Sequence, residues 1–175
     1  MDLNSKLKLE PITEEDTDLI LKWRNNINVK KNFIFQQMFT KDIHLNWLKT
    51  NVFTGKTAQF IINYDGTSIG STFLRDIDVD NNKAEFGIFI GEDNYRGQGL
   101  GTQATLQILK YGFEKLNLNK IFLRVLNNNT SAVNSYIKSG FQKEGLFRED
   151  VCINNKYYDV LFMSILKNEW RKIND

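Results

Sequence analysis

The chain of 175 residues has little cysteine, histidine or proline, with one of each: Cys152, His44 and Pro11. A single cysteine excludes an internal disulfide, and one cysteine with one histidine cannot complete a Cys/His zinc site. A site made of carboxylates alone is left open, but the sequence carries no signal for one, and we expect no metal ion. No second proline and no glycine/serine-rich stretch separates two parts of the chain. The sequence therefore predicts a single domain over residues 1–175.

Long apolar runs and a strong charge of one sign are also missing. No stretch approaches the roughly 18 apolar residues that span a bilayer, and the first residues lack the apolar segment of a secretion signal. The 23 basic residues nearly balance the 21 acidic ones, and the formal net charge of +2 gives no broad attraction for nucleic acid. We therefore expect a cytoplasmic protein that binds neither nucleic acid nor a membrane.

Hydrophobic periodicity gives the order of the elements. Alternating or continuous apolar residues predict strands at about 6–12, 57–63, 69–77, 84–90, 120–126, 141–150 and 156–166. Helical spacing and capping residues predict helices over 13–25, 40–51, 100–116 and 129–139. This order predicts a mixed α/β sheet with helices on its faces.

Two glycine features mark the middle of the chain. Gly87 lies inside the strand at 84–90 and predicts a bulge or a close approach by another backbone. Gly97, Gly99 and Gly101 alternate just before the long helix, so successive N–H groups and the helix dipole favour an anion, most simply a phosphate or pyrophosphate. The spacing matches neither the dinucleotide fingerprint nor the nucleotide P-loop.

The glycine-rich stretch and a second motif together carry a family resemblance. The pattern R-x-x-G-x-G over 96–101 resembles the acyl-CoA pyrophosphate motif of the GCN5-related N-acetyltransferases, called GNAT. The pattern N-x-x-A-x-x-x-Y-x-x-x-G-F over 129–141 is similar to the second signature of that family. Residues 84–87 and 144–149 are most similar to the branch with ribosomal-protein and spermidine acetyltransferases. The resemblance implies a mostly antiparallel, twisted sheet of about seven strands flanked by about four helices.

The resemblance also implies that acetyl-CoA is the cosubstrate. The pantetheine arm would pair with the strand residues Ile88, Phe89 and Ile90, and Asn129 would bind the arm or cap its helix. A bulge at Gly87 would separate two parallel strands to admit the arm. The CoA pyrophosphate would lie on the backbone amides of Arg96, Gly97, Gln98, Gly99, Leu100, Gly101 and Thr102.

Two residues are candidates for acid–base catalysis. Tyr136 would protonate the departing thiolate, because a phenol of pKa ~10 stays protonated at neutral pH; otherwise it is a packed helix residue. A lysine-like amine of pKa ~10.4 costs about 4.6 kcal/mol to deprotonate at pH 7, so such an acceptor needs a base. Glu85 is the candidate base, through a water molecule, or else a structural carboxylate bound to backbone or arginine.

The N-terminal segment bears on the acceptor. The runs K-W-R-N at 22–25 and H-L-N-W-L at 44–48 resemble N-acetyltransferases that act on nucleotide-linked 4-amino sugars. This resemblance makes Trp23, Arg24 and His44 candidate substrate-binding residues, with core packing for the tryptophan and a surface position for the histidine as the alternatives. The segment also holds a group of basic residues: Lys22, Arg24, Lys30, Lys31 and Lys41.

These basic residues would repel a polycation, so the sequence favours a neutral or anionic acceptor, such as a nucleotide-linked amino sugar. The alternatives are the N-terminal amine of a ribosomal protein, a polyamine such as spermidine, and a CoA-binding module without catalysis. The partner is therefore a small-molecule or peptide amine, and a homodimer is compatible with the sequence.

Overall fold

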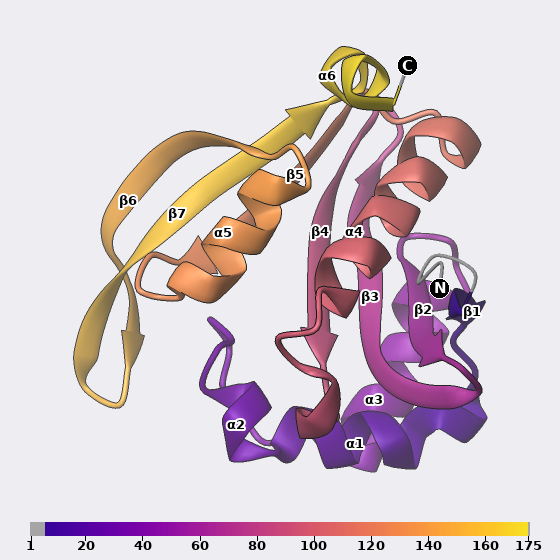
Figure 1. Ribbon diagram of the computed structural model, residues 1–175. Helices are drawn as coiled ribbons and strands as arrows, with labels where there is room; N and C mark the ends of the chain where they lie inside the picture. Colours follow the sequence, from indigo (N-terminus) through magenta and orange to yellow (C-terminus); the bar gives the residue numbers. More distant parts are fainter. Residues whose placement is uncertain (1–5, 175) are drawn as a thin grey trace.

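The computed structural model describes residues 6–174 and is built on one seven-stranded sheet (Figure 1). The strands lie in the order β1-β2-β3-β4-β5-β7-β6, and every pairing is antiparallel except that between β4 and β5. The strands are β1 (Leu7–Pro11), β2 (Ala58–Tyr64), β3 (Thr67–Asp78), β4 (Lys83–Ile90), β5 (Lys120–Leu126), β6 (Gln142–Ile153) and β7 (Lys156–Leu166). The predicted fold class is confirmed.

Six α-helices occur in the described residues, where the sequence predicted about four. They are α1 (Thr17–Asn25), α2 (Ile27–Lys30), α3 (Lys41–Trp47), α4 (Leu100–Lys110), α5 (Thr130–Lys138) and α6 (Lys167–Asn174). The short α2 was not among the predicted helices; Asn26 caps it by accepting a hydrogen bond from the N–H of Asn28. The additional α6 docks through Trp170, whose ring stacks on Phe113.

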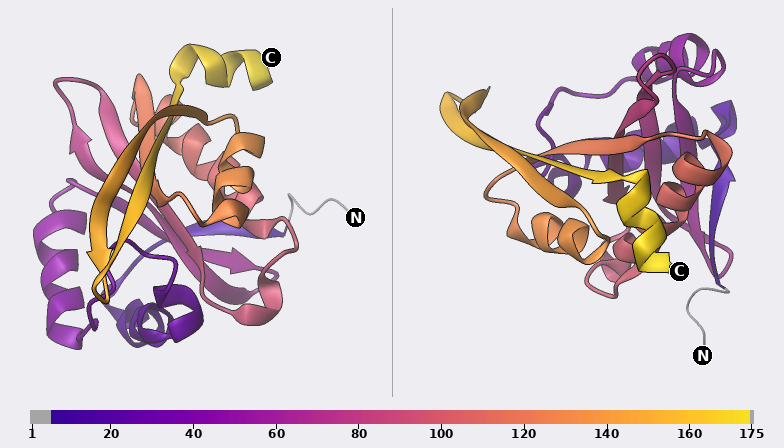
Figure 2. Two further views of the ribbon diagram at one scale, coloured as in Figure 1. Left: turned by 90° about the vertical axis from the view of Figure 1, so that its left-hand side faces the viewer. Right: turned by 90° about the horizontal axis from the view of Figure 1, so that it is seen from above.

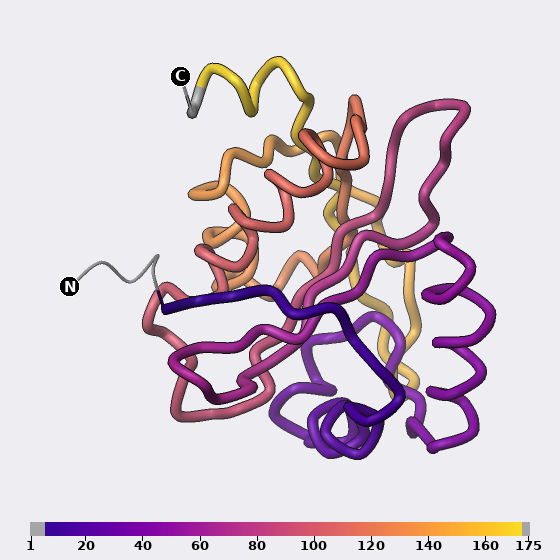
Figure 3. The backbone as a smooth tube through the Cα atoms, turned by 90° about the vertical axis from the view of Figure 1, so that its right-hand side faces the viewer, coloured from indigo at the N-terminus to yellow at the C-terminus, as the bar shows by residue number. Residues whose placement is uncertain are grey.

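The helices cover the two faces of the sheet. The right-hand view of Figure 2 shows α3 on the side of the strands opposite α4 and α5, and Figure 3 shows the same two layers from another direction. The main core lies between the sheet and the layer of α4 and α5, and includes Ile108, Leu109, Ile121 and Met163. A second core packs α1 against the other face. Each such buried aliphatic side chain contributes about 1.5–3 kcal/mol.

Strand β4 contributes to both layers because successive side chains point to opposite faces of a sheet. Phe86 and Ile88 pack with the layer of α4 and α5. Phe89 packs on the other face, with its ring edge-on to those of Trp23 and Phe33. Glu85 lies on the α1 side with Phe89, because residues four apart in a strand point to the same face.

Strands β4 and β5 separate after a short paired region. Only residues 83–85 pair with residues 120–122, in parallel. Beyond that point β4 pairs only with β3, and β5 only with β7. The facing edges of the two strands therefore leave backbone N–H and C=O groups unpaired, as at the edge of a sheet. This gap admits an extended, amide-bearing ligand between the two strands.

The predicted bulge at Gly87 is wrong. The register between β3 and β4 runs without a shift from Gly70 opposite Ile90 to Arg75 opposite Glu85, so Gly87 is regularly paired with Phe73. Gly87 makes room for a side chain instead: a Cβ atom there would lie 2.3 Å from Cζ of Phe73, so the phenyl ring would have to move. The close approach is made by an aromatic ring and not by a backbone, and the strands separate without a bulge in β4.

Candidate active site

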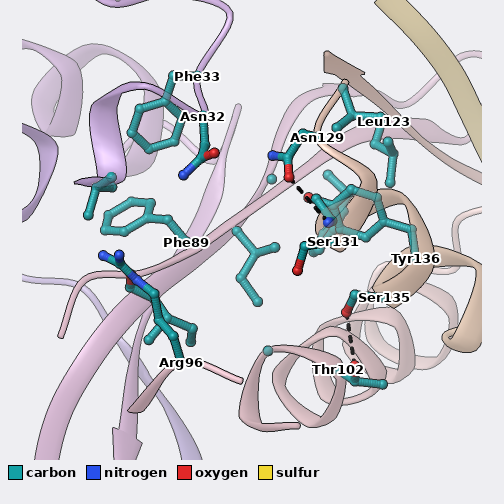
Figure 4. Close-up of a pocket in the computed structure, with 18 of the residues that line it drawn as sticks. Asn32, Phe33, Phe89, Arg96, Thr102, Leu123, Asn129, Ser131, Ser135 and Tyr136 are labelled. Atoms are coloured by element: carbon teal, nitrogen blue, oxygen red, sulfur yellow. Dashed lines mark hydrogen bonds between the residues drawn. The ribbon is translucent and has the colours of Figure 1, made fainter. Parts of the chain in front are cut away.

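A cavity of about 610 Å³ extends through the gap between β4 and β5. Its lining includes Ile88 and Tyr136 from the layer of α4 and α5, and Phe89 and Arg24 from the α1 side. Figure 4 shows Asn129 on one side of this pocket, with Arg96 and Phe89 on the other. The volume lies within the roughly 300–1,000 Å³ typical of small-molecule sites. A ligand in this pocket reaches both faces of the sheet.

The glycine-rich stretch forms one end of the pocket. Gly97 has φ of 74° and Gly99, the N-cap of α4, has φ of 80°, and both values lie in the left-handed region that favours glycine. Among the described residues, no acceptor is within hydrogen-bonding geometry of the backbone N–H groups from 97 to 102. Unpaired N–H groups at a helix N-terminus form an anion site. The geometry supports the predicted pyrophosphate site at Gly97, Gly99, Gly101 and Thr102, which line the pocket.

One of the predicted backbone contacts in this loop differs. The N–H of Arg96 donates to the carbonyl of Asp93, so this amide is not free. The guanidinium of Arg96 folds back, donating from Nε to the carbonyl of Ile90 and pairing with Asp93 at 2.8 Å. Leu100 is a core side chain, and Gln98 points away to the carbonyl of Asn94. These side chains shape the loop, and its anion-binding capacity comes from backbone N–H groups.

Helix α5 lines the pocket opposite this loop. Asn129 caps the helix by accepting a hydrogen bond from the N–H of Ala132 at 3.3 Å, and it also lines the pocket, so both expected roles remain compatible. Thr102 and Ser135 join the two helices through their hydroxyl groups at 2.9 Å (Figure 4). Sequence reasoning missed Ser131, Asn134, Ser135 and Lys138 as lining residues, although they lie on the helix that carries the second motif.

Tyr136 lies on α5 and lines the pocket. Its ring packs edge-on against Phe86 and contacts Phe141. Burial raises the pKa of the hydroxyl to about 12, so the group stays protonated across the neutral and mildly alkaline range. Both predicted roles, general acid and packed helix residue, fit this position, because the ring is packed and the residue also lines the pocket. Its role as a general acid stays a prediction.

Glu85 lies at the closed end of the gap with a side chain that is 8% exposed. Oε2 accepts hydrogen bonds from Nε and Nη2 of Arg75 at 3.1 and 3.0 Å. Oε1 accepts from Nε of Arg124 at 3.0 Å, and Oε2 also accepts from its Nη2 at 3.2 Å. Oε2 therefore accepts three hydrogen bonds and Oε1 accepts one. This arrangement favours the structural carboxylate, and the role of Glu85 as a base stays a prediction.

Two predicted substrate-binding residues lie outside the pocket. Trp23 is fully buried in the core on the α1 side and donates from Nε1 to Glu92 at 2.8 Å. His44 is 1% exposed, and its Nδ1 lies 3.1 Å from the hydroxyl of Thr17. Burial lowers the pKa of His44, which favours the neutral ring. The histidine therefore joins α3 to α1, and the tryptophan packs α1 against the end of β4. The substrate-binding reading is corrected for both.

Of the basic residues in the N-terminal segment, Arg24 alone lines the pocket among those described. Lys22 pairs with Glu92 at 2.6 Å, and Lys41 lies 3.9 Å from Asp18, so both are partly balanced at the surface. Sequence reasoning missed two other cations that line the pocket, Arg75 and Arg124. Strands β3 and β5 bring them there. The only sequence signal for these two arginines is the alternation of side chains along a strand, and it can be interpreted only when the register of the sheet is known.

The fold and the site together define a CoA-dependent acyltransferase. The chain belongs to the GNAT acetyltransferases: the family described as the acetyltransferase (GNAT) domain matches residues 6–142. It is therefore an acetyl-CoA-dependent N-acetyltransferase of GNAT type, as the resemblance implied, and acetyl-CoA is its cosubstrate.

Named relatives fall in the expected branch. The chain is 30% identical to a spermidine N(1)-acetyltransferase of Escherichia coli K12, over 94% of this chain and 88% of the relative. It is 28% identical to the spermidine N-acetyltransferase of Vibrio cholerae in complex with CoA and spermine, with a TM-score of 0.89 over 95% and 99% of the two chains. Another structure of the Vibrio enzyme, with a TM-score of 0.84, is described as dodecameric, at 27% identity over 98% and 99% of the chains. These names agree with the polyamine alternative better than with a nucleotide-linked amino sugar.

Across residues 6–174, no helix is long and apolar enough to cross a bilayer. Within the same range, no three histidine, cysteine or acidic side chains come together as a candidate metal cluster.

Proposed function

We propose that this N-acetyltransferase moves the acetyl group by direct attack of a primary amine on the thioester, through a tetrahedral intermediate. The observation that carries the proposal is the open gap between β4 and β5. The free N–H groups of Gly97–Thr102 lie at one end of the gap, on one face of the sheet. Arg24, Arg75 and Arg124 line the pocket on the other face. CoA would enter from the first side and the acceptor from the second. Unpaired N–H groups of β4 would polarise the thioester carbonyl.

The charges of the pocket bear on how the amine loses its proton. Glu85 is the one carboxylate among the described lining residues, and it is bound to Arg75 and Arg124. Nearby cations disfavour an ammonium ion and so lower the pKa of an amine bound beside them. An α-amino-like group of pKa ~8 needs only about 1.4 kcal/mol to deprotonate at pH 7. The pocket therefore suits an amine of low pKa that attacks without a dedicated base.

Two acceptor classes are supported by different observations. The names of the relatives support a polyamine. The lining residues support a neutral or anionic acceptor, because five of them are cations and Glu85 is their only acid among those described: Arg24, Arg75, Arg96, Arg124 and Lys138. We favour the second class, with a nucleotide-linked amino sugar as its example, because a polycation would meet like charges at each end of the pocket. The N-terminal amine of a ribosomal protein is a third candidate, which neither of these two observations singles out.

Acceptor-dependent release of CoA thiol tests the function. The purified chain would be incubated with acetyl-CoA and with spermidine, a nucleotide-linked amino sugar or a peptide with a free N-terminus. We expect thiol release that requires an amine, together with an acetylated product seen by mass spectrometry. Thiol release that no amine accelerates would instead support the CoA-binding module.

We also propose self-association, in keeping with the dodecameric Vibrio enzyme. Three apolar side chains on β6 and β7 are about half exposed or more: Leu146, Phe147 and Tyr157. Light scattering measures the mass of the particle in solution, and a monomer at micromolar concentration would contradict this expectation.

A further inference from the structure

Arg24, the penultimate residue of α1, carries a guanidinium group with no hydrogen-bond or ion-pair partner among the described residues. The group lies between two aromatic rings, 3.9 Å from the centroid of Phe33 and 4.6 Å from that of Phe39. Its Nε is buried and unpaired, and the side chain makes no hydrogen bond or ion pair with any of residues 6–174. The two rings fix the plane of the guanidinium but supply no negative charge.

The surroundings of Arg24 add positive charge. The pKa of Arg24 is lowered to about 10, mainly by burial and in addition by repulsion from Arg75. Arg75 and Arg124 share the single carboxylate of Glu85, and Nη1 of each makes no hydrogen bond to another described residue. Asp76 is 3.7 Å from Nε of Arg75 but is 72% exposed, so water screens its charge. These three guanidinium groups thus line one pocket with one buried carboxylate, which pairs with two of them.

An unpaired, partly buried cation is costly unless an anion compensates it. Arginine presents its donors in a planar fork that matches the oxygens of a carboxylate or phosphate. The stacked rings already hold the Arg24 fork in place, so little side-chain entropy is lost when an anion binds. The group is therefore preorganised for an oxyanion.

The position of the cluster separates it from the CoA phosphates. Arg75, Glu85 and Arg124 lie on the α1 face of the sheet, because Glu85 alternates with Phe86, which packs toward α5. The free N–H groups of Gly97–Thr102 belong to the opposite layer, at the start of α4. An anion bound at Arg24 would therefore belong to the molecule that enters from the acceptor side.

We propose that Arg24, with Arg75 beside it, binds a phosphate or carboxylate group carried by the acceptor amine. The inference rests on the proposed acetyltransferase function and specifies its substrate class: an amine that also bears an oxyanion. Glu85 is then a positioning residue that holds Arg75 and Arg124 in one geometry. A polyamine, which has no anionic group, would leave Arg24 unpaired in the complex.

Pairs of small acceptors that share one amine test this proposal. The probes are 2-aminoethyl phosphate against ethanolamine, and β-alanine against β-alaninamide, with spermidine as the cationic reference. For the natural chain we expect kcat/KM to be about tenfold or more higher for the anionic member of at least one pair, since a charge-assisted hydrogen bond contributes roughly 1.5–3 kcal/mol. The phosphate pair and the carboxylate pair distinguish the two oxyanions.

Variants of Arg24 assign the preference to this residue. Arg24→Gln should reduce the anionic-to-neutral ratio of kcat/KM by about tenfold or more, and comparing ratios cancels the difference in amine pKa. Arg24→Lys, which keeps the charge and loses the planar fork, should retain part of the preference. Arg171→Gln, on the exposed surface of α6, is the matched control and should keep the full ratio. If circular dichroism shows that Arg24→Gln does not fold, the proposal is tested by Arg24→Lys and by inhibition of the natural chain with inorganic phosphate.

Inorganic phosphate should inhibit competitively against the acceptor and, at the same ionic strength, not against acetyl-CoA. Equal anionic-to-neutral ratios in the natural chain and Arg24→Gln would overturn the proposal, as would a higher kcat/KM for spermidine than for every anionic probe. Inhibition competitive with acetyl-CoA alone would overturn it too, by placing phosphate in the CoA loop. If acetyl-CoA binds and neutral amines are acetylated, these results leave the acetyltransferase function intact. Absence of acetyl-CoA binding and of turnover with every amine would overturn both.

Discussion

Replacing Glu85 by glutamine separates a structural carboxylate from a catalytic base. The side chain is 8% exposed and accepts four hydrogen bonds from Arg75 and Arg124. Breaking a buried ion pair costs about 3–5 kcal/mol, and the arginines, which are 25% and 29% exposed, place the effect at the low end, about 3 kcal/mol. In a chain of this length a loss of that size lowers Tm by about 6–12 °C.

The assay combines urea unfolding with steady-state kinetics at saturating acetyl-CoA. Glu144→Gln is the matched control, because Glu144 also pairs with a cation, Lys120 at 2.6 Å, but is 44% exposed and should contribute no more than about 1 kcal/mol. We expect Glu85→Gln to lower stability well beyond this control and to keep the pH dependence of kcat/KM. A variant of unchanged stability that loses about 10²-fold or more in kcat, with an altered pH profile, would refute the structural assignment.

The remaining predictions concern Tyr136 and the glycine loop. Tyr136→Phe should lower kcat about 10²-fold when chemistry limits the rate and leave the Kd of acetyl-CoA unchanged in calorimetry; full kcat would return the residue to packing alone. Because its folded pKa is raised to about 12, the stability that the hydroxyl's proton contributes is present below pH 10 and lost as pH rises from about 10 to 12; Tyr136→Phe should show less of this alkaline loss in thermal unfolding. Gly99→Ala forces a side chain to φ of 80°, at a cost of about 1–2 kcal/mol, and should weaken acetyl-CoA binding, whereas Gly55→Ala, at φ of 78° in a turn with equally open space, should lose similar stability and bind normally. Equal Kd values for these two variants would remove the loop from the CoA site.

Sequence patterns predicted the sheet, and they singled out the loop and the helix that line one part of the pocket, because both depend on local signals. Alternating glycines before a helical pattern fix the positions of N–H groups through backbone geometry within a few residues. The motif over 129–141 likewise places Asn129 and Tyr136 on one helix. These features needed no knowledge of how distant segments pack. In the structure, residues of the glycine-rich loop and of α5 line the same pocket.

The acceptor side could not be predicted in the same way, because tertiary packing determines it. A surface position was the alternative for His44, yet His44 is buried against Thr17, whereas the neighbouring Ile43 is 48% exposed. Arg75 reaches Glu85 through the register between β3 and β4, and Arg124 does so across the end of the β4–β5 pairing. No sequence spacing between residues 75 and 124 encodes that meeting. Likewise, the gap follows from where β4–β5 pairing stops, and not from a bulge at Gly87.

The most direct test of the acetyltransferase account is a crystal structure of this chain with CoA bound. We predict that the pyrophosphate lies on the N–H groups of Gly97–Thr102 and that the pantetheine arm lies in the gap between β4 and β5. The thiol should lie within hydrogen-bonding distance of the Tyr136 hydroxyl, about 3–3.5 Å for an O–H···S contact, with the Arg24 cluster open on the opposite face. CoA bound outside the gap, or with its thiol directed away from Tyr136, would contradict the account.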